Sequence, residues 1–199
     1  MIPAQFIFLG IILQFIGVTF YIRSIIAGKT KPNLVSWTIW ALAPFIGAYF
    51  QFKAGAGVSA IPVFMAGFNP FLIVIFCFLK KDAYWKLNYF DFVCGGFSLL
   101  SLFLYMVTHN LGISIFFAVF GDFLAGLPTY AKAWKFPETE NGLLYLFAAV
   151  SNIIGLLTLS VWSFSSSFFG IYLVVQCLGI LFCIYRKKIF PPRITQTSL

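Results

Sequence analysis

Apolar residues run in long stretches along this chain, and short polar connections separate them. A helix needs about 20 apolar residues to cross a bilayer, and seven stretches come close to that length. The pattern therefore predicts an all-α fold, a bundle of seven transmembrane helices. Their expected bounds are 4–26, 33–53, 58–79, 90–108, 113–134, 142–162 and 168–185.

The composition agrees with a membrane location. Of the 199 residues, 61% are hydrophobic and 9% are charged, whereas a soluble domain has about 45–50% apolar and 25% charged residues. Soluble enzymes, nucleic-acid binders and disordered regulators are therefore excluded. We expect one multi-pass domain over 1–199 in the inner membrane, with the lipid bilayer as a partner and no nucleic acid. The first apolar run has no basic region before it, so we expect it to remain as a helix.

The basic residues indicate how the chain is oriented. An odd number of spans places the termini on opposite faces, and twelve cations then share one face, while Lys53 stands on the other. The positive-inside rule predicts that the N-terminus is outside and that the C-terminus, with a short basic tail at 189–199, is cytoplasmic. The twelve cations are Arg23, Lys29, Lys31, Lys80, Lys81, Lys86, Lys132, Lys135, Arg186, Lys187, Lys188 and Arg193. Aromatic residues near the span ends are expected to form an interfacial belt, namely Trp37, Tyr84, Trp85, Tyr89, Trp134, Trp162 and Tyr185.

Two landmarks indicate an internal repeat. The end of the third span, Phe76–Lys81, is similar to the end of the seventh, Phe182–Lys187, at an offset of 106 residues. The first and third loops on the basic side turn at Pro32 and Pro137, an offset of 105. We expect a first repeat at about 4–81, a linker helix at about 90–108 and a second repeat at about 113–188. Because the linker helix inverts the direction of the chain, both repeats have the same orientation in the membrane. The alternative to a repeat is chance similarity among Phe-rich helix ends.

This 3+1+3 arrangement resembles the PQ-loop/SWEET-type transporter superfamily. The segments 28–37 (GKTKPNLVSW), 128–134 (PTYAKAW) and 137–140 (PETE) are similar to a bacterial membrane branch of it. The resemblance implies SWEET-like parallel repeats that carry a small polar solute, a sugar or similar metabolite, by alternating access. The chain departs from the family pattern where Thr129, rather than Gln, follows Pro128.

Asp122 is the one carboxylate deep inside a predicted span. A charge there costs at least about 2.5–3.5 kcal/mol, so we expect it to face the bundle interior or to be protonated. It is a candidate for substrate binding and for coupling transport to protons. The alternative is a packing role, in which it bonds to a neighbouring helix.

Other polar and aromatic residues are candidates for solute contact. The resemblance implies a pair of amides that flank the substrate, and Asn69 and Gln176 occupy nearly equivalent positions in the two repeats. Trp40, Tyr145 and Asn152 lie on helical faces whose aromatic rings could stack on a solute. Packing between helices explains the two amides equally simply, and it is the simpler explanation for Trp40, Tyr145 and Asn152. Proline breaks helical bonding, so Pro44, Pro70 and Pro128 are candidate hinges.

The remaining residues offer no catalytic pattern. The four cysteines and His109 are scattered over different segments, so no metal site and no cofactor are expected. Glu138 and Glu140 are expected to pair with Lys135 or Lys132, or to cap the sixth span. An enzyme that acts on lipid is disfavoured, and homo-oligomer formation stays open. The alternative to a carrier is a non-transporting membrane receptor or assembly factor on the same scaffold.

Overall fold

The computed structural model describes residues 2–3, 5–53, 61–80, 83–108, 111–159 and 162–190. Seven α-helices follow one another within these ranges, so the predicted all-α fold with seven helices is confirmed. Lys81, His109, Arg193 and most of the basic tail lie outside the described residues. The helices are α1 (Phe6–Ile26), α2 (Leu34–Lys53), α3 (Ile61–Leu79), α4 (Tyr89–Val107), α5 (Leu111–Lys135), α6 (Gly142–Leu157) and α7 (Phe164–Ile189), and a short 3₁₀ turn, η2 (Pro137–Thr139), precedes α6.

Local capping shifts the ends of the last two helices from the expected bounds. Helix α7 begins at Phe164, earlier than expected, because Ser163 and Ser166 form a reciprocal capping box at its start. It also continues four residues beyond the expected end. Helix α6 ends at Leu157, before the expected residue 162, and the Thr158 hydroxyl donates to the Gly155 carbonyl oxygen there.

Large apolar side chains cover the outside of the helices, as in a membrane protein. Phe8 and Phe92 are examples, with more than half of each side chain exposed. Three of the described helices, namely α1, α4 and most of α7, are long and apolar enough to cross a membrane. Asn69, Asp91, Thr129 and Gln176, by contrast, are buried. Apolar groups outside and polar groups inside are the arrangement that a lipid solvent favours.

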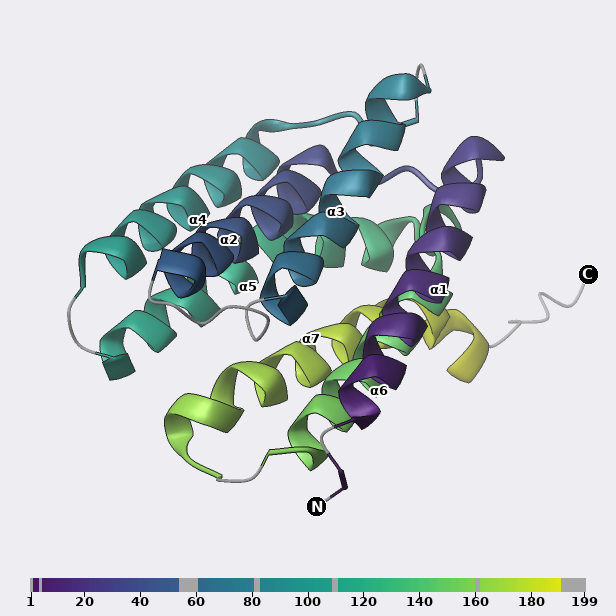
Figure 1. Cartoon of the computed structure of the whole chain (residues 1–199). Helices are drawn as coiled ribbons and strands as arrows, with labels where there is room; N and C mark the ends of the chain where they lie inside the picture. Colours follow the sequence, from purple (N-terminus) through teal and green to yellow (C-terminus); the bar gives the residue numbers. More distant parts are fainter. Residues whose placement is uncertain are drawn as a thin grey trace, which may run out of the picture.

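The helices pack in two groups of three with α4 at the side (Figure 1). In the first group α3 packs against both α1 and α2, and in the second α7 packs against both α5 and α6. The groups meet where α1 lies along α6 and α2 lies along α5. Helix α4 packs against α2 and α5, at the edge of the bundle away from α1.

Glycine permits the close contacts at two of these helix pairs. A Cβ atom on Gly17 of α1 would lie 3.2 Å from the Leu144 Cα of α6, so the backbones approach closely there. A Cβ on Gly142 of α6 would lie 2.6 Å from the hydroxyl of Tyr185 of α7. Small residues at such positions allow helices in lipid to gain van der Waals contact.

Three connections meet at one end of the bundle, which we call the basic end. The Lys31 amide donates to the Thr139 carbonyl oxygen at 3.0 Å, and the Trp85 amide donates to the Pro32 carbonyl oxygen at 2.8 Å. These bonds join the α1–α2, α3–α4 and α5–α6 connections. The ten described cations of the basic group lie in these connections or in the helix ends beside them. At the other end, the Ile2 amide donates to the Leu157 carbonyl oxygen.

The hydrophobic core lies in the half of the bundle nearer the basic end. Tyr21, Ile25, Ile73 and Cys77 have no exposed surface, and all four belong to the later halves of α1 and α3, which run toward the basic end. Ile180 and Ile184 of α7 join the same cluster. The bundle is therefore tightly packed in this half.

Candidate functional site

A cavity of about 190 Å³ lies between the two groups of helices. Its lining residues on α7 extend from Phe169 to Ile180, about 16 Å along the helix axis. Helices α1, α2, α3, α5, α6 and α7 all contribute to it. The lining residues are Gln14, Val18, Trp37, Trp40, Pro44, Ala66, Asn69, Pro70, Asp122, Leu144, Tyr145, Ala148, Asn152, Phe169, Leu173, Gln176, Cys177 and Ile180.

All six residues that the sequence proposes for substrate binding line this cavity. They come from five helices and are separated by up to 136 positions in the chain, so only the packing of the bundle brings them together. Pro44 and Pro70, two of the three proposed hinge residues, line it as well. The third, Pro128, is buried inside α5. The six are Trp40, Asn69, Asp122, Tyr145, Asn152 and Gln176.

Asp122 reaches the cavity from α5 and binds a neighbouring helix. The Tyr172 hydroxyl of α7 donates to Asp122 Oδ2 at 2.9 Å. Trp40 Nε1 of α2 donates to the main-chain oxygen of Asp122 at 3.4 Å. The residue thus connects three helices, as the packing interpretation requires, while its carboxylate remains on the cavity wall, as the binding interpretation requires.

A chain of amide hydrogen bonds forms another part of the wall. Asn69 Nδ2 donates to Gln14 Oε1 at 3.3 Å, and Gln14 Nε2 donates to the Ser151 hydroxyl at 3.1 Å. Asn69 Oδ1 remains buried without a partner, while the Gln176 side-chain amide interacts with the Asp122 carboxylate and its Nε2 makes no other hydrogen bond. A buried polar atom without a partner costs about 1–3 kcal/mol, so Asn69 Oδ1 would gain from a bound polar group.

Aromatic rings complete the wall. Trp37 and Trp40 stand nearly perpendicular, with their ring centroids 5.1 Å apart and an interplanar angle of 89°. Trp37 was expected in the interfacial belt, but it is 3% exposed and packs on Tyr21, so that expectation is wrong. Trp37 lies near the start of α2, as expected, but its side chain points from the helix toward the interior of the bundle. Trp37 Nε1 is a further buried atom without a partner.

Asn152 contributes less than the other amides. Its Nδ2 donates to the Ala148 carbonyl oxygen of its own helix at 2.8 Å. One of its two N–H donors is therefore used, and it has no buried atom without a partner, so the residue is a weaker candidate for solute contact than Asn69.

A buried polar network lies between the cavity and the basic end. Tyr21 and Tyr145 both donate their hydroxyls to Glu140 Oε2, at 2.8 and 3.3 Å. Lys132 Nζ forms an ion pair with Glu140 Oε1 at 2.5 Å, and the two side chains are 1% and 0% exposed. The same ammonium donates to the Lys31 carbonyl oxygen. The predicted pairing of Glu140 with Lys132 is confirmed, and the network ties α1, α5, α6 and two connections together.

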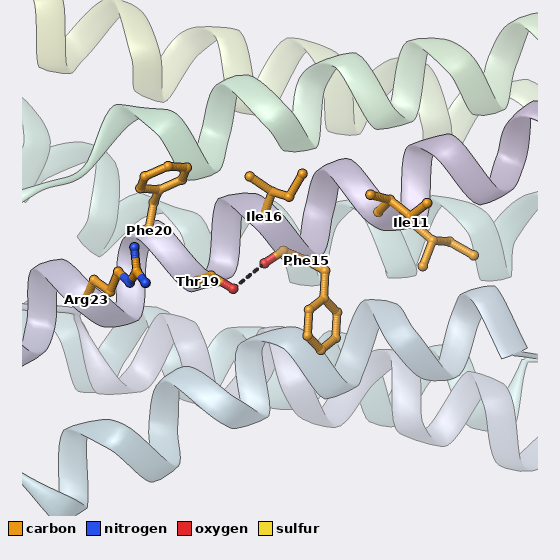
Figure 2. A pocket seen from close by; sticks show the side chains of 7 residues that line it. Ile11, Phe15, Ile16, Thr19, Phe20 and Arg23 are labelled. Atoms are coloured by element: carbon orange, nitrogen blue, oxygen red, sulfur yellow. Dashed lines mark hydrogen bonds between the residues drawn. The ribbon is translucent and has the colours of Figure 1, made fainter.

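A larger depression of about 600 Å³ lies on the outer face of α1. Its lining residues are Ile11, Ile12, Phe15, Ile16, Thr19, Phe20 and Arg23, all from this one helix. Figure 2 shows Ile16 and Phe20 pointing to one side of α1 and Phe15 to the other, so their side chains do not converge. The Thr19 hydroxyl already donates to the Phe15 carbonyl oxygen, at 2.9 Å. We therefore assign the candidate site to the central cavity.

Two polar residues of the site are not among the candidates that the sequence predicts. Gln14 is a cavity residue and Tyr172 is the hydrogen-bond partner of Asp122. The sequence contains a pattern that could have indicated each of them. Gln14 is a polar residue deep in an apolar stretch, and Tyr172 precedes Gln176 by four residues and so shares its helix face.

The cavity offers no metal centre that the described residues could form. Within the described ranges, no three His, Cys, Asp or Glu residues lie close enough together to hold a metal ion. Comparison with known proteins gives no match, whether to a family model, to a curated protein or to a solved structure.

Proposed function

We propose that this protein is a membrane carrier that moves a small polar solute by alternating access. The observation that carries the proposal is the central cavity, which is walled by polar and aromatic side chains from six helices. Carriers built from two repeats bind their solutes near the middle of the bilayer, at the repeat interface. A sugar or similar metabolite is the solute class that the family resemblance favours, and Asp122 is the group that would link transport to protons.

The helix contacts support two parallel repeats. Exchanging α1 with α5, α2 with α6 and α3 with α7 converts each contact within one group into a contact within the other. The same exchange converts the α1–α6 contact into the α5–α2 contact. Asn69 and Gln176, which an offset of 106 residues nearly superposes, both line the cavity. A second copy of one three-helix unit would produce this pattern.

The buried network supports a state closed on one side. Glu140, Lys132 and the two tyrosines fill the bundle between the cavity and the basic end, and the hydrophobic core surrounds them. The ion pair joins α5 to the connection that leads into α6, and Tyr21 adds α1 from the first group. Opening this side requires the two groups to separate there, which breaks the hydrogen bond between Tyr21 and Glu140.

We further propose that the basic end faces the cytoplasm. All ten described cations of the basic group lie at that end. The positive-inside rule then places the N-terminus outside and the C-terminus in the cytoplasm, with seven spans between them. The closed network is thus a cytoplasmic gate, and the bundle crosses the membrane with α2, α3, α5 and α6 among the spans.

Flux in reconstituted vesicles tests this proposal. Asn69→Ala and Asp122→Asn are expected to abolish uptake of a transported solute while the amount of protein in the membrane stays the same. Leu178→Ala is the matched control, because Leu178 lies on α7 but is 49% exposed on the outer surface. Normal uptake in both cavity variants would refute the assignment of the site. A stable copurifying partner and no flux of any solute would favour the receptor alternative.

A further inference from the structure

The cavity carries one kind of charge. Asp122 is its acidic residue, and the described residues that line it include no Lys, Arg or His. The nearest acidic neighbour on the basic side, Glu140, is already paired with Lys132. A carboxylate in an apolar wall needs a counterion or a proton. A negatively charged solute would be repelled here, and a positively charged one would be attracted.

The rest of the wall suits an organic cation better than a metal ion. Hard metal ions such as Mg²⁺ and Ca²⁺ take about six or more oxygen ligands, but most of this wall is carbon, including the rings of Trp37, Trp40, Tyr145 and Phe169. Ring faces attract amines and quaternary ammonium groups through their quadrupoles, most strongly when water is excluded. The perpendicular indoles of Trp37 and Trp40 form an aromatic corner of the kind that holds such groups.

The buried atoms without partners indicate which polar group the other end of the ligand carries. Trp37 Nε1 is a donor without a partner and Asn69 Oδ1 is an acceptor without one, while Gln176 Nε2 has only the Asp122 carboxylate beside it. Asn69 and Gln176 are 6% and 5% exposed, so water in bulk does not serve them. A hydroxyl group both accepts and donates, and it would satisfy a donor and the acceptor together. The volume of about 190 Å³ is below the roughly 300–1,000 Å³ of pockets that hold drug-sized ligands, which limits the ligand to a small solute.

We propose that the cavity binds a small hydroxylated organic cation, an amino alcohol with an amine or a quaternary ammonium group. Asp122 supplies the opposite charge, Trp40 and Trp37 supply the aromatic corner, and Asn69 and Gln176 bind the hydroxyl. This inference rests on the proposed carrier function for the role of the ligand, since both use the same cavity. It replaces the neutral sugar that the family resemblance favours.

Binding to the purified protein tests the ligand class without any need for transport. The probes are choline and ethanolamine as cations, glucose as a neutral polyol and acetate as an anion, each titrated by calorimetry. Wild-type protein is expected to bind at least one of the two cations saturably and to bind neither glucose nor acetate. Asp122→Asn is expected to weaken cation binding at least tenfold, because it removes the charge but leaves an oxygen for the Tyr172 hydroxyl. Glu138→Gln, which removes an exposed carboxylate outside the cavity, is expected to bind as wild type does.

Three results would overturn the inference. The first is saturable binding of glucose or acetate with no binding of the cations. The second is a cation affinity that Asp122→Asn leaves unchanged. The third is no saturable binding of either cation up to about 10 mM, a concentration well above typical Michaelis constants. The vesicle experiment separates this outcome from failure of the carrier proposal. Cation binding without flux refutes transport and leaves the ligand class standing. Flux of a neutral solute that Asp122→Asn does not change refutes the ligand class and leaves transport standing.

Discussion

Replacing Lys132 by methionine would leave the Glu140 carboxylate buried without its cation. The two side chains are 1% and 0% exposed, so the value of about 0–1 kcal/mol for surface ion pairs does not apply. At a separation of 2.5 Å and an effective dielectric constant of about 20, the attraction is about 7 kcal/mol. Desolvation of the two ions costs several kcal/mol each, so the intact pair adds little net stability. Losing one partner, however, costs about 3–5 kcal/mol.

A double-mutant cycle in mixed micelles measures this effect as the free energy of unfolding. We expect Lys132→Met to lose about 3–5 kcal/mol. Glu140→Gln should lose somewhat less, because the new amide oxygen still accepts from Tyr21 and because Lys132 keeps the Lys31 carbonyl oxygen. The double variant should lose less than the two single losses added together, by at least about 1 kcal/mol, since it buries no lone charge.

The matched control is Lys135→Met, which removes an exposed ammonium from the same turn of α5. It should change stability by no more than about 0.5 kcal/mol. Additive single losses, or a loss below about 1 kcal/mol for Lys132→Met, would show that the pair does not hold this end of the bundle closed. The reasoning for the cytoplasmic gate would then be refuted as well.

Three further predictions concern other parts of the bundle. Tyr172→Phe removes the hydroxyl that donates to Asp122, and it should lower the free energy of unfolding by about 0.6–1.7 kcal/mol, which unfolding in micelles can measure. Gly67→Ala should lower it by about 1–3 kcal/mol, because the new methyl group would lie 2.9 Å from the main-chain oxygen of Ala41 in α2. Gly96→Ala, where no atom lies within 4 Å, should be neutral or stabilising, and equal losses would contradict the packing. In a cysteine-free background, Lys29→Cys should react with an impermeant thiol reagent only from the cytoplasmic side and Trp162→Cys only from outside, and the reverse pattern would overturn the orientation.

The sequence predicts the helices well because a single physical requirement sets their lengths. Each apolar stretch is long enough to satisfy its own backbone hydrogen bonds as a helix, and seven such stretches become seven helices. The ends are less predictable because capping side chains decide them locally. The expected bounds place Ser163 in a loop, but its hydroxyl accepts from the Ser166 amide, and α7 begins there.

The sequence predicts those site residues that are polar within apolar stretches. It does not predict contacts between residues on different helices. Asp122, Asn69 and Gln176 are conspicuous in apolar stretches because a polar group in lipid is costly wherever it points outward. Their partners depend on how the helices pack side by side. No pattern in the sequence places Tyr172 against Asp122, or Tyr21 against a glutamate 119 residues away.

Paired and unpaired polar groups lie in different parts of this bundle. Toward the basic end, Glu140 has two tyrosine hydroxyls and an ammonium, and Thr129 donates to the Ser36 hydroxyl at 2.9 Å. Within the described ranges, Trp37 and Asn69 have buried atoms without partners, Gln176 Nε2 has only the Asp122 carboxylate beside it, and all three residues line the cavity. The one other such residue, apart from the ion-paired Glu140, is Asn33, whose oxygen caps the start of α2.

Packing alone does not explain this distribution. A residue that serves only to hold helices together gains by completing its hydrogen bonds, because each orphaned atom costs about 1–3 kcal/mol. Asn69 donates to Gln14 but leaves its own Oδ1 without a partner. Unpaired amides that face a cavity are instead what a binding site needs before its ligand arrives. The position of these atoms, more than their number, is therefore the reason to regard the cavity as a site for a solute.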